Sequence, residues 1–85
     1  MKEYIAKYLH NKHITCSKSE IIRMDILLNS NDYTFKYLMI YVDTNTNRVL
    51  NFNVSDHKYY ANTNKYLFMD IRKATREITV EEILS

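Results

Sequence analysis

Apolar and polar residues alternate through the middle of the chain, which is typical of β-strands with one buried face. Three segments carry this alternation, at positions 20–28, 33–43 and 48–54. The links between them, 29–32 and 44–47, contain only Asn, Asp, Ser and Thr, which are residues that favour tight turns. The pattern therefore predicts a three-stranded antiparallel β-meander.

The second predicted hairpin suggests a register for this sheet. With Asn45 and Thr46 at the centre of the turn, Asp43 lies opposite Arg48 and the following pairs match apolar side chains with each other. A one-residue shift would break these pairs. The expected core face comprises alternate residues of the three strands: Ile22, Met24, Ile26, Leu28, Tyr33, Phe35, Tyr37, Met39, Tyr41, Leu50, Phe52 and Val54.

The other face of the predicted sheet is also apolar. It carries Ile21, Leu38, Ile40, Val42 and Val49. An antiparallel sheet with one solvated face is normally polar on that face, so we expect something to cover it. The N-terminal helix, a second copy in a homodimer and a functional partner are the three alternatives.

Helices are expected at both ends of the chain. Residues 2–10 form a helix in this interpretation, because Ile5, Tyr8 and Leu9 share one helical face, and 10–19 form a polar loop. From position 65 the apolar residues follow a helical stripe, although 66–70 also fits a fourth strand.

A possible capping box, Thr79 with Glu82, predicts a separate last turn of helix. The expected fold is α+β in a single domain, 1–85, with an N-terminal helix, the three-stranded meander and one or more C-terminal helices.

The length, the cysteine content and the distribution of apolar residues narrow the classes to which the protein could belong. With 85 residues the chain is one small domain. Cys16 is its only cysteine, so no internal disulfide forms, which fits a reducing compartment. Charged residues in the first ten positions do not fit a signal peptide, and no run of 18 apolar residues occurs. We therefore expect a cytoplasmic protein, inside a bacterial host cell, without a membrane partner.

Residue usage suggests a source. Gly and Pro are absent, and Phe, Tyr, Met, Ile, Asn and Lys make up 41 of the 85 residues. Such a bias favours an AT-rich genome, of a low-GC bacterium or of a phage or plasmid within one. The net charge of +2, from 12 basic and 10 acidic residues, argues against a nucleic-acid binder driven by electrostatics and against a DNA mimic.

Candidate metal and catalytic residues are few. His10, His13 and Cys16 are spaced by three, and His57 is a conceivable fourth zinc ligand, but this is not a standard ligand spacing. Cys16 with His13 as its base lacks a third group to orient the base. The simpler interpretation is a polar loop after a helix. We expect no metal, no cofactor and no enzymatic activity.

The eight tyrosines carry more information. Those at 33, 37 and 41, with Phe35, would stack nucleic-acid bases if they were exposed, but their Met and Ile neighbours favour a core position. Tyr59, Tyr60 and Tyr66 lie outside the predicted strands, near Lys58 and Lys65. Tyrosine is enriched at protein interfaces, so these five residues form the expected partner-binding site.

The leading hypothesis is therefore a small, non-catalytic protein-binding module. It would be an inhibitor, encoded by a phage or mobile element, that occludes a host enzyme in the manner of anti-CRISPR and anti-restriction proteins. The alternative is a nucleic-acid-binding regulator with a basic strip on its C-terminal helices. That strip would comprise Lys58, Lys65, Arg72, Lys73 and Arg76.

Overall fold

Two helices precede the sheet in the computed structural model, which describes residues 1–58 and 65–84, and their side chains up to residue 79. The helices are α1 (Lys2–Asn11) and α2 (Lys18–Ser30). The strands are β1 (Tyr37–Asp43), β2 (Arg48–Ser55) and β3 (Lys65–Asp70), and α3 (Ile71–Leu84) follows directly. The predicted class is confirmed: an α+β fold with an N-terminal helix, a three-stranded antiparallel sheet and a C-terminal helix.

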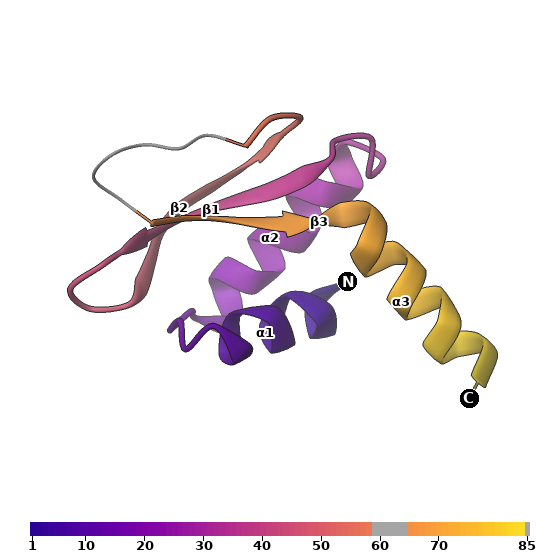
Figure 1. Cartoon of the computed structure of the whole chain (residues 1–85), viewed down its shortest axis with the longest axis horizontal. Coiled ribbons are helices and arrows are strands. Elements are labelled where there is room, and N and C mark those ends of the chain that lie inside the picture. The colour runs from indigo at the N-terminus through magenta and orange to yellow at the C-terminus, as the bar shows by residue number, and fades with distance from the viewer. Residues whose placement is uncertain (59–64, 85) are drawn as a thin grey trace.

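The strand order is β2-β1-β3, so β1 is the central strand and both of its neighbours run antiparallel to it (Figure 1). β2 follows β1 through a hairpin, whereas β3 lies on the other side of β1. The strand alternative for 66–70 is thus confirmed, and the helical stripe begins only at Ile71.

The prediction of a strand at 20–28 is wrong, because this segment lies within helix α2. A capping box starts the helix: the Ser17 hydroxyl accepts the Glu20 N–H at 3.2 Å, and the Glu20 carboxylate accepts the Ser17 N–H at 3.1 Å. These bonds satisfy backbone donors that a helix start otherwise leaves unpaired. Met24 is fully buried, but Ile26, which we predicted in the core, is 56% exposed.

A β-bulge overturns most of the predicted register. Asp43 does lie opposite Arg48, as predicted, but Leu50 is an extra residue in β2, so that Tyr41 pairs with Asn51. Beyond the bulge the pairing is displaced by one residue, so that Phe52 and Val54 share a face with Ile40 and Leu38 instead of with Met39 and Tyr37. That face of β1 packs against the helices, so Tyr37, Met39 and Tyr41 lie away from the core, and Leu50 is 55% exposed.

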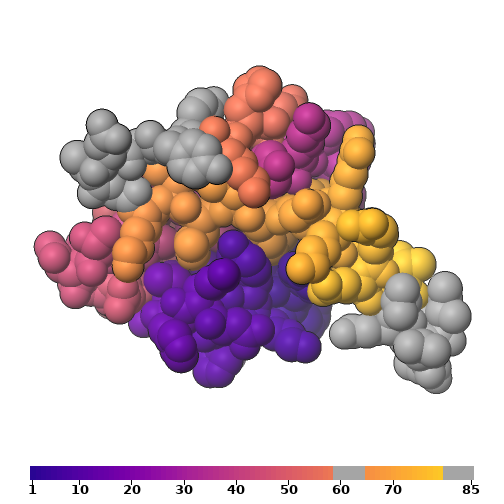
Figure 2. Space-filling view, in the orientation of Figure 1, coloured from indigo at the N-terminus to yellow at the C-terminus, as the bar shows by residue number. Residues whose placement is uncertain are grey.

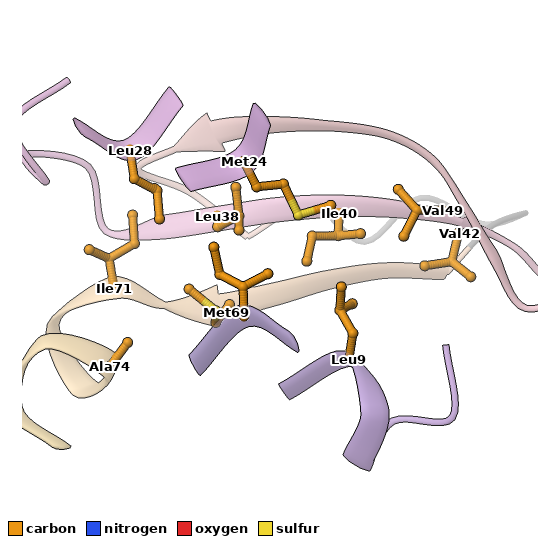
Figure 3. Packing of buried hydrophobic residues seen from close by; sticks show 11 residues of the cluster. Leu9, Met24, Leu28, Leu38, Ile40, Val42, Val49, Met69, Ile71 and Ala74 are labelled. Atoms are coloured by element: carbon orange, nitrogen blue, oxygen red, sulfur yellow. The ribbon is translucent and has the colours of Figure 1, made fainter. Parts of the chain in front are cut away.

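The core lies between the sheet and the two N-terminal helices (Figures 1 and 3). Its buried members are Ile5, Leu9, Met24, Leu28, Leu38, Ile40, Val42, Val49, Met69, Ile71 and Ala74. The apolar face that we expected to need a cover is thus covered by the chain's own α1 and α2. Leu38, Ile40, Val42 and Val49 are buried within the fold, and Ile21 is partly buried, so this face is not available to a second copy.

Helix α3 leaves the end of β3 and passes beside the start of α1 (Figure 2). Tyr4 and Glu77 line a cavity between the two helices. The predicted break at Thr79 does not occur, because α3 is continuous and the Thr79 hydroxyl donates to the Thr75 carbonyl at 2.9 Å. Among the described residues, no helix has the length and apolar character needed to cross a membrane.

Within the described part of the chain, the turns place four residues in the left-handed region, and none of them is glycine: His13, Asp32, Tyr33 and Asn47. Asn47 closes the β1–β2 hairpin, where its N–H donates to the Asp43 carbonyl at 2.8 Å. Asn and Asp tolerate this conformation, and both predicted turn segments contain one such residue. For Tyr33 the same conformation is sterically unfavourable, because its side chain is bulky.

Candidate binding surface on the open face of the sheet

The face of the sheet opposite α1 and α2 carries a cluster of aromatic side chains, which we call the open face. Its members alternate along the three strands: Tyr37, Met39 and Tyr41 from β1, Tyr66 and Phe68 from β3, and Asn51 and Asn53 from β2. The four rings and Met39 are partly exposed, and both asparagines are exposed. All three described helices lie on the other side of the sheet or beyond its end (Figure 1).

Cross-strand pairing brings the rings into contact. Tyr41 lies directly opposite Tyr66, and their ring centroids are 5.1 Å apart. Phe68 continues the row, with its centroid 6.3 Å from that of Tyr66 and 5.9 Å from that of Tyr37. The Tyr37–Phe68 contact is edge-to-face, at 83°, which is a favourable geometry for aromatic pairs. The four rings thus form one continuous apolar surface.

Polar groups border this surface. The Lys58 ammonium lies 5.3 Å from the centroid of the Tyr37 ring, within range of a cation–π interaction. Asp43 of β1 lies opposite Arg48 of β2 at one end of the sheet, and Asp70 of β3 lies opposite Tyr37 of β1 at the other end. An apolar centre with a polar border is the usual organisation of a protein interface.

Two residues of the predicted partner-binding site lie at the open face, Lys58 and Tyr66. Tyr59 and Tyr60 lie outside the described residues, and they follow Lys58 directly in the sequence. Lys65 is exposed at the start of β3, opposite Val42. Tyr33 does not belong to this face: it precedes β1, and its phenol donates to the side chain of Asn29.

The structure places the five residues of the predicted basic strip in three segments of the chain. Arg72, Lys73 and Arg76 are exposed on α3. Lys65 stands at the opposite end of β3 from this helix, a separation of roughly 17 Å for a strand of that length. Lys58 lies over Tyr37 on the open face, and Tyr37 is opposite Asp70, at the end of β3 where α3 begins. Lys65 is therefore the member that lies apart from the cations of α3.

The structure does not bring His10, His13 and Cys16 together: among the described residues, no three His, Cys, Asp or Glu side chains are grouped so that they could hold a metal ion. Burial raises the pKa of the Cys16 thiol to about 11; the Glu20 carboxylate adds to the increase, and Arg23 opposes it. A protonated thiol is a poor nucleophile and a poor metal ligand.

The alternation in the sequence predicts Tyr37 and Tyr41 in the core, and Phe68 falls in a segment predicted as helix or as a fourth strand, so these three were missed as surface residues. One signal in β1 separates its two faces. The residues at 38, 40 and 42 are purely aliphatic, whereas those at 37 and 41 carry phenol groups that need water or a partner. The aliphatic set is therefore the better candidate for the core.

Comparisons with protein-family models, with curated proteins and with solved structures found no significant match to this chain. The chemistry of the open face is consequently the basis on which a function is proposed.

Proposed function

We propose that this chain is a small protein-binding module, and that the open face is the surface with which it contacts its partner. The observation that carries the proposal is the continuous row of partly exposed rings at Tyr37, Tyr41, Tyr66 and Phe68. Aromatic residues and Met are enriched at interface centres and dominate binding energy, because they supply a large contact area with few rotatable bonds.

The charge on this face favours a protein over a nucleic acid as the partner. The Lys58 ammonium lies over the Tyr37 ring of this face. Asp43 is the last residue of β1 and Asp70 the last residue of β3, and because these strands are antiparallel the two carboxylates lie at opposite ends of the sheet. Tight nucleic-acid binding usually needs several cations on phosphates. A near-neutral aromatic surface fits the apolar patch of another protein better.

Such a module would act by occlusion, covering a surface that its partner needs. The partner we propose is a host enzyme, and the proposed setting is an inhibitor from a phage or mobile element, of the anti-CRISPR or anti-restriction type. The support for this setting is the bias toward residues of AT-rich codons.

The test compares the open face with a second apolar surface in the same chain. Tagged wild type, the pair Tyr41→Ala with Tyr66→Ala, and the pair Ile22→Ala with Ile26→Ala are used to capture proteins from a low-GC bacterial lysate, with and without nuclease. Ile22 and Ile26 are exposed on α2, so the second pair controls for general stickiness.

We expect one stoichiometric protein that survives nuclease, is retained by the Ile22/Ile26 variant and is lost from the Tyr41/Tyr66 variant. Circular dichroism melts establish that each variant is folded. Equal retention by all three proteins would reject the open face as the binding surface.

A second candidate, stacking of single-stranded nucleic acid on the same rings, is favoured by the cation–π position of Lys58. Fluorescence anisotropy with a labelled oligonucleotide over a salt series tests it. Binding that falls steeply with salt and is lost in the Tyr41/Tyr66 variant supports this candidate. Loss on Arg72→Ala with Arg76→Ala, but not in the tyrosine variant, would support the α3 cations instead.

A further inference from the structure

Among the residues that the structure describes, β2 is an edge strand: β1 lies on one side of it, and no other strand of the sheet lies on the other. An edge strand presents unpaired backbone N–H and C=O groups, to which a strand of a second molecule can add. In an antiparallel pair, alternate residues direct their N–H groups toward the neighbour or away from it. Whether this edge is open to a second strand therefore depends on what the outward N–H groups of β2 bind.

In β2 these N–H groups have acceptors within the chain. The Phe52 N–H donates to Oδ1 of Asn51 at 2.9 Å, and the Val54 N–H donates to Oδ1 of Asn53 at 2.8 Å. Each acceptor belongs to the residue directly before the donor. The two asparagines thus shield the outer edge of the second half of the strand.

The first half of β2 is shielded by a different segment. The Val49 N–H donates to the Thr15 carbonyl at 3.2 Å, and the Thr15 N–H donates to the Asn47 carbonyl at 2.8 Å. This short parallel bridge comes from the loop between α1 and α2. The outward donors at Val49, Phe52 and Val54 are therefore occupied.

We propose that Asn51 and Asn53 close the β2 edge against strand addition by a second copy of this chain. Asparagine is disfavoured in strands, yet it occurs here twice, two residues apart, on either side of Phe52. Because an N–H only donates, each amide must present its oxygen to the backbone. An incoming strand has to displace both oxygens before it can pair. The proposal does not depend on whether the open face binds a protein.

The first test measures amide hydrogen exchange by NMR in dilute, monomeric protein. We compare wild type with Asn51→Ala/Asn53→Ala, with Asn51→Asp/Asn53→Asp, which keeps both acceptor oxygens, and with Asn45→Ala in the exposed hairpin turn. The Phe52 and Val54 amides should exchange about two- to tenfold faster in the alanine pair than in wild type. The aspartate pair and Asn45→Ala should match wild type.

The second test measures self-association by analytical ultracentrifugation over a range of concentrations. The alanine pair should self-associate where wild type and Asn45→Ala are monomeric, and its Phe52 and Val54 amides should become protected as it does so. If the pair does not fold, Asn53→Ala alone supplies the same comparison at Val54. A folded alanine variant that remains monomeric, or that associates without protecting these amides, would overturn the proposal.

Discussion

Tyr41 and Tyr66 lie directly opposite each other on neighbouring antiparallel strands, with ring centroids 5.1 Å apart and ring planes inclined by 34°. Both residues belong to the face of the sheet opposite the buried Ile40 and Val42, whereas α1 and α2 lie on the side of the core (Figure 1). Their contact therefore contributes to the sheet without belonging to the buried core.

A double-mutant cycle measures this contact. Tyr41→Leu and Tyr66→Leu should show a coupling free energy of about 0.5–1.5 kcal/mol in urea unfolding, since aromatic pairs contribute this much beyond area burial. The same cycle with Tyr41→Leu and Tyr33→Leu serves as the control, because Tyr33 lies before β1. That control pair should be additive, and additivity of the Tyr41–Tyr66 pair would contradict the contact.

Substitutions at two neighbouring apolar positions of helix α2 should change the free energy of unfolding by very different amounts. Met24→Ala should lower the free energy of unfolding by about 2–5 kcal/mol, because Met24 is fully buried and its removal leaves a cavity. Ile26→Ala should change it by less than about 0.5 kcal/mol, because Ile26 is largely exposed. Urea unfolding of both variants tests this. Equal losses would favour a strand at 20–28, where both residues share one face.

The capping box makes stability depend on pH. Hydrogen bonds from the Ser17 backbone N–H and hydroxyl lower the pKa of Glu20 below its ordinary value of 4.5, and Arg23 and Arg48 act in the same direction. A lowered folded-state pKa contributes stability that is present above the unfolded pKa and is lost as pH falls through the folded value.

Ser17→Ala should therefore cost about 0.5–2 kcal/mol at neutral pH. Glu20→Gln, which removes the titrating carboxylate, should flatten the loss of stability below pH 4.5. Thermal melts from neutral to acidic pH check both effects, with Ser19→Ala, within α2 and outside the cap, as the matched control. If Glu20→Gln and wild type lose stability in parallel as the pH falls, the capping box is not the cause.

Cys16 should react slowly in the folded protein. Burial raises the pKa of its thiol from the ordinary value of 9.0 to about 11, and only the thiolate reacts. At pH 8 the folded protein should therefore be alkylated by iodoacetamide on the order of 100-fold more slowly than the protein in urea. Mass spectrometry over time gives the rates. Equal rates in the two states would mean that Cys16 is not shielded by the fold.

Local patterns were sufficient wherever neighbouring residues decide the structure. Ile5 and Leu9 share one helical face, and both are buried in α1, as predicted. Asp43 lies opposite Arg48 because a short turn of Thr and Asn residues joins them. The same local information was available for α2 in Ser17 and Glu20, which match a capping box before an apolar run, but the alternation at 22, 24, 26 and 28 fits a strand equally well.

The candidate surface depended on a feature that no local pattern specifies. The extra residue Leu50 in β2 displaces the register by one, and because side chains alternate between faces, Phe52 and Val54 join the face of Ile40 and Leu38. Tyr37 and Tyr41, which the register without a bulge places in the core, lie on the open face. The phenol groups favour this outcome, but both faces of β1 are apolar enough to be buried, so alternation alone did not distinguish them.

By itself, the sequence determined a small α+β domain with a helix at each end, an antiparallel sheet between them and turns built from Asn and Asp. Spacing and turn chemistry act over a few residues, and they can be read without knowing the fold. The tertiary structure decided which face of the sheet the helices cover. That choice depends on which face packs more completely against α1 and α2, a comparison between segments distant in sequence. Aliphatic Leu38, Ile40 and Val42 fill that space and leave the phenol groups at water, where a partner can reach them.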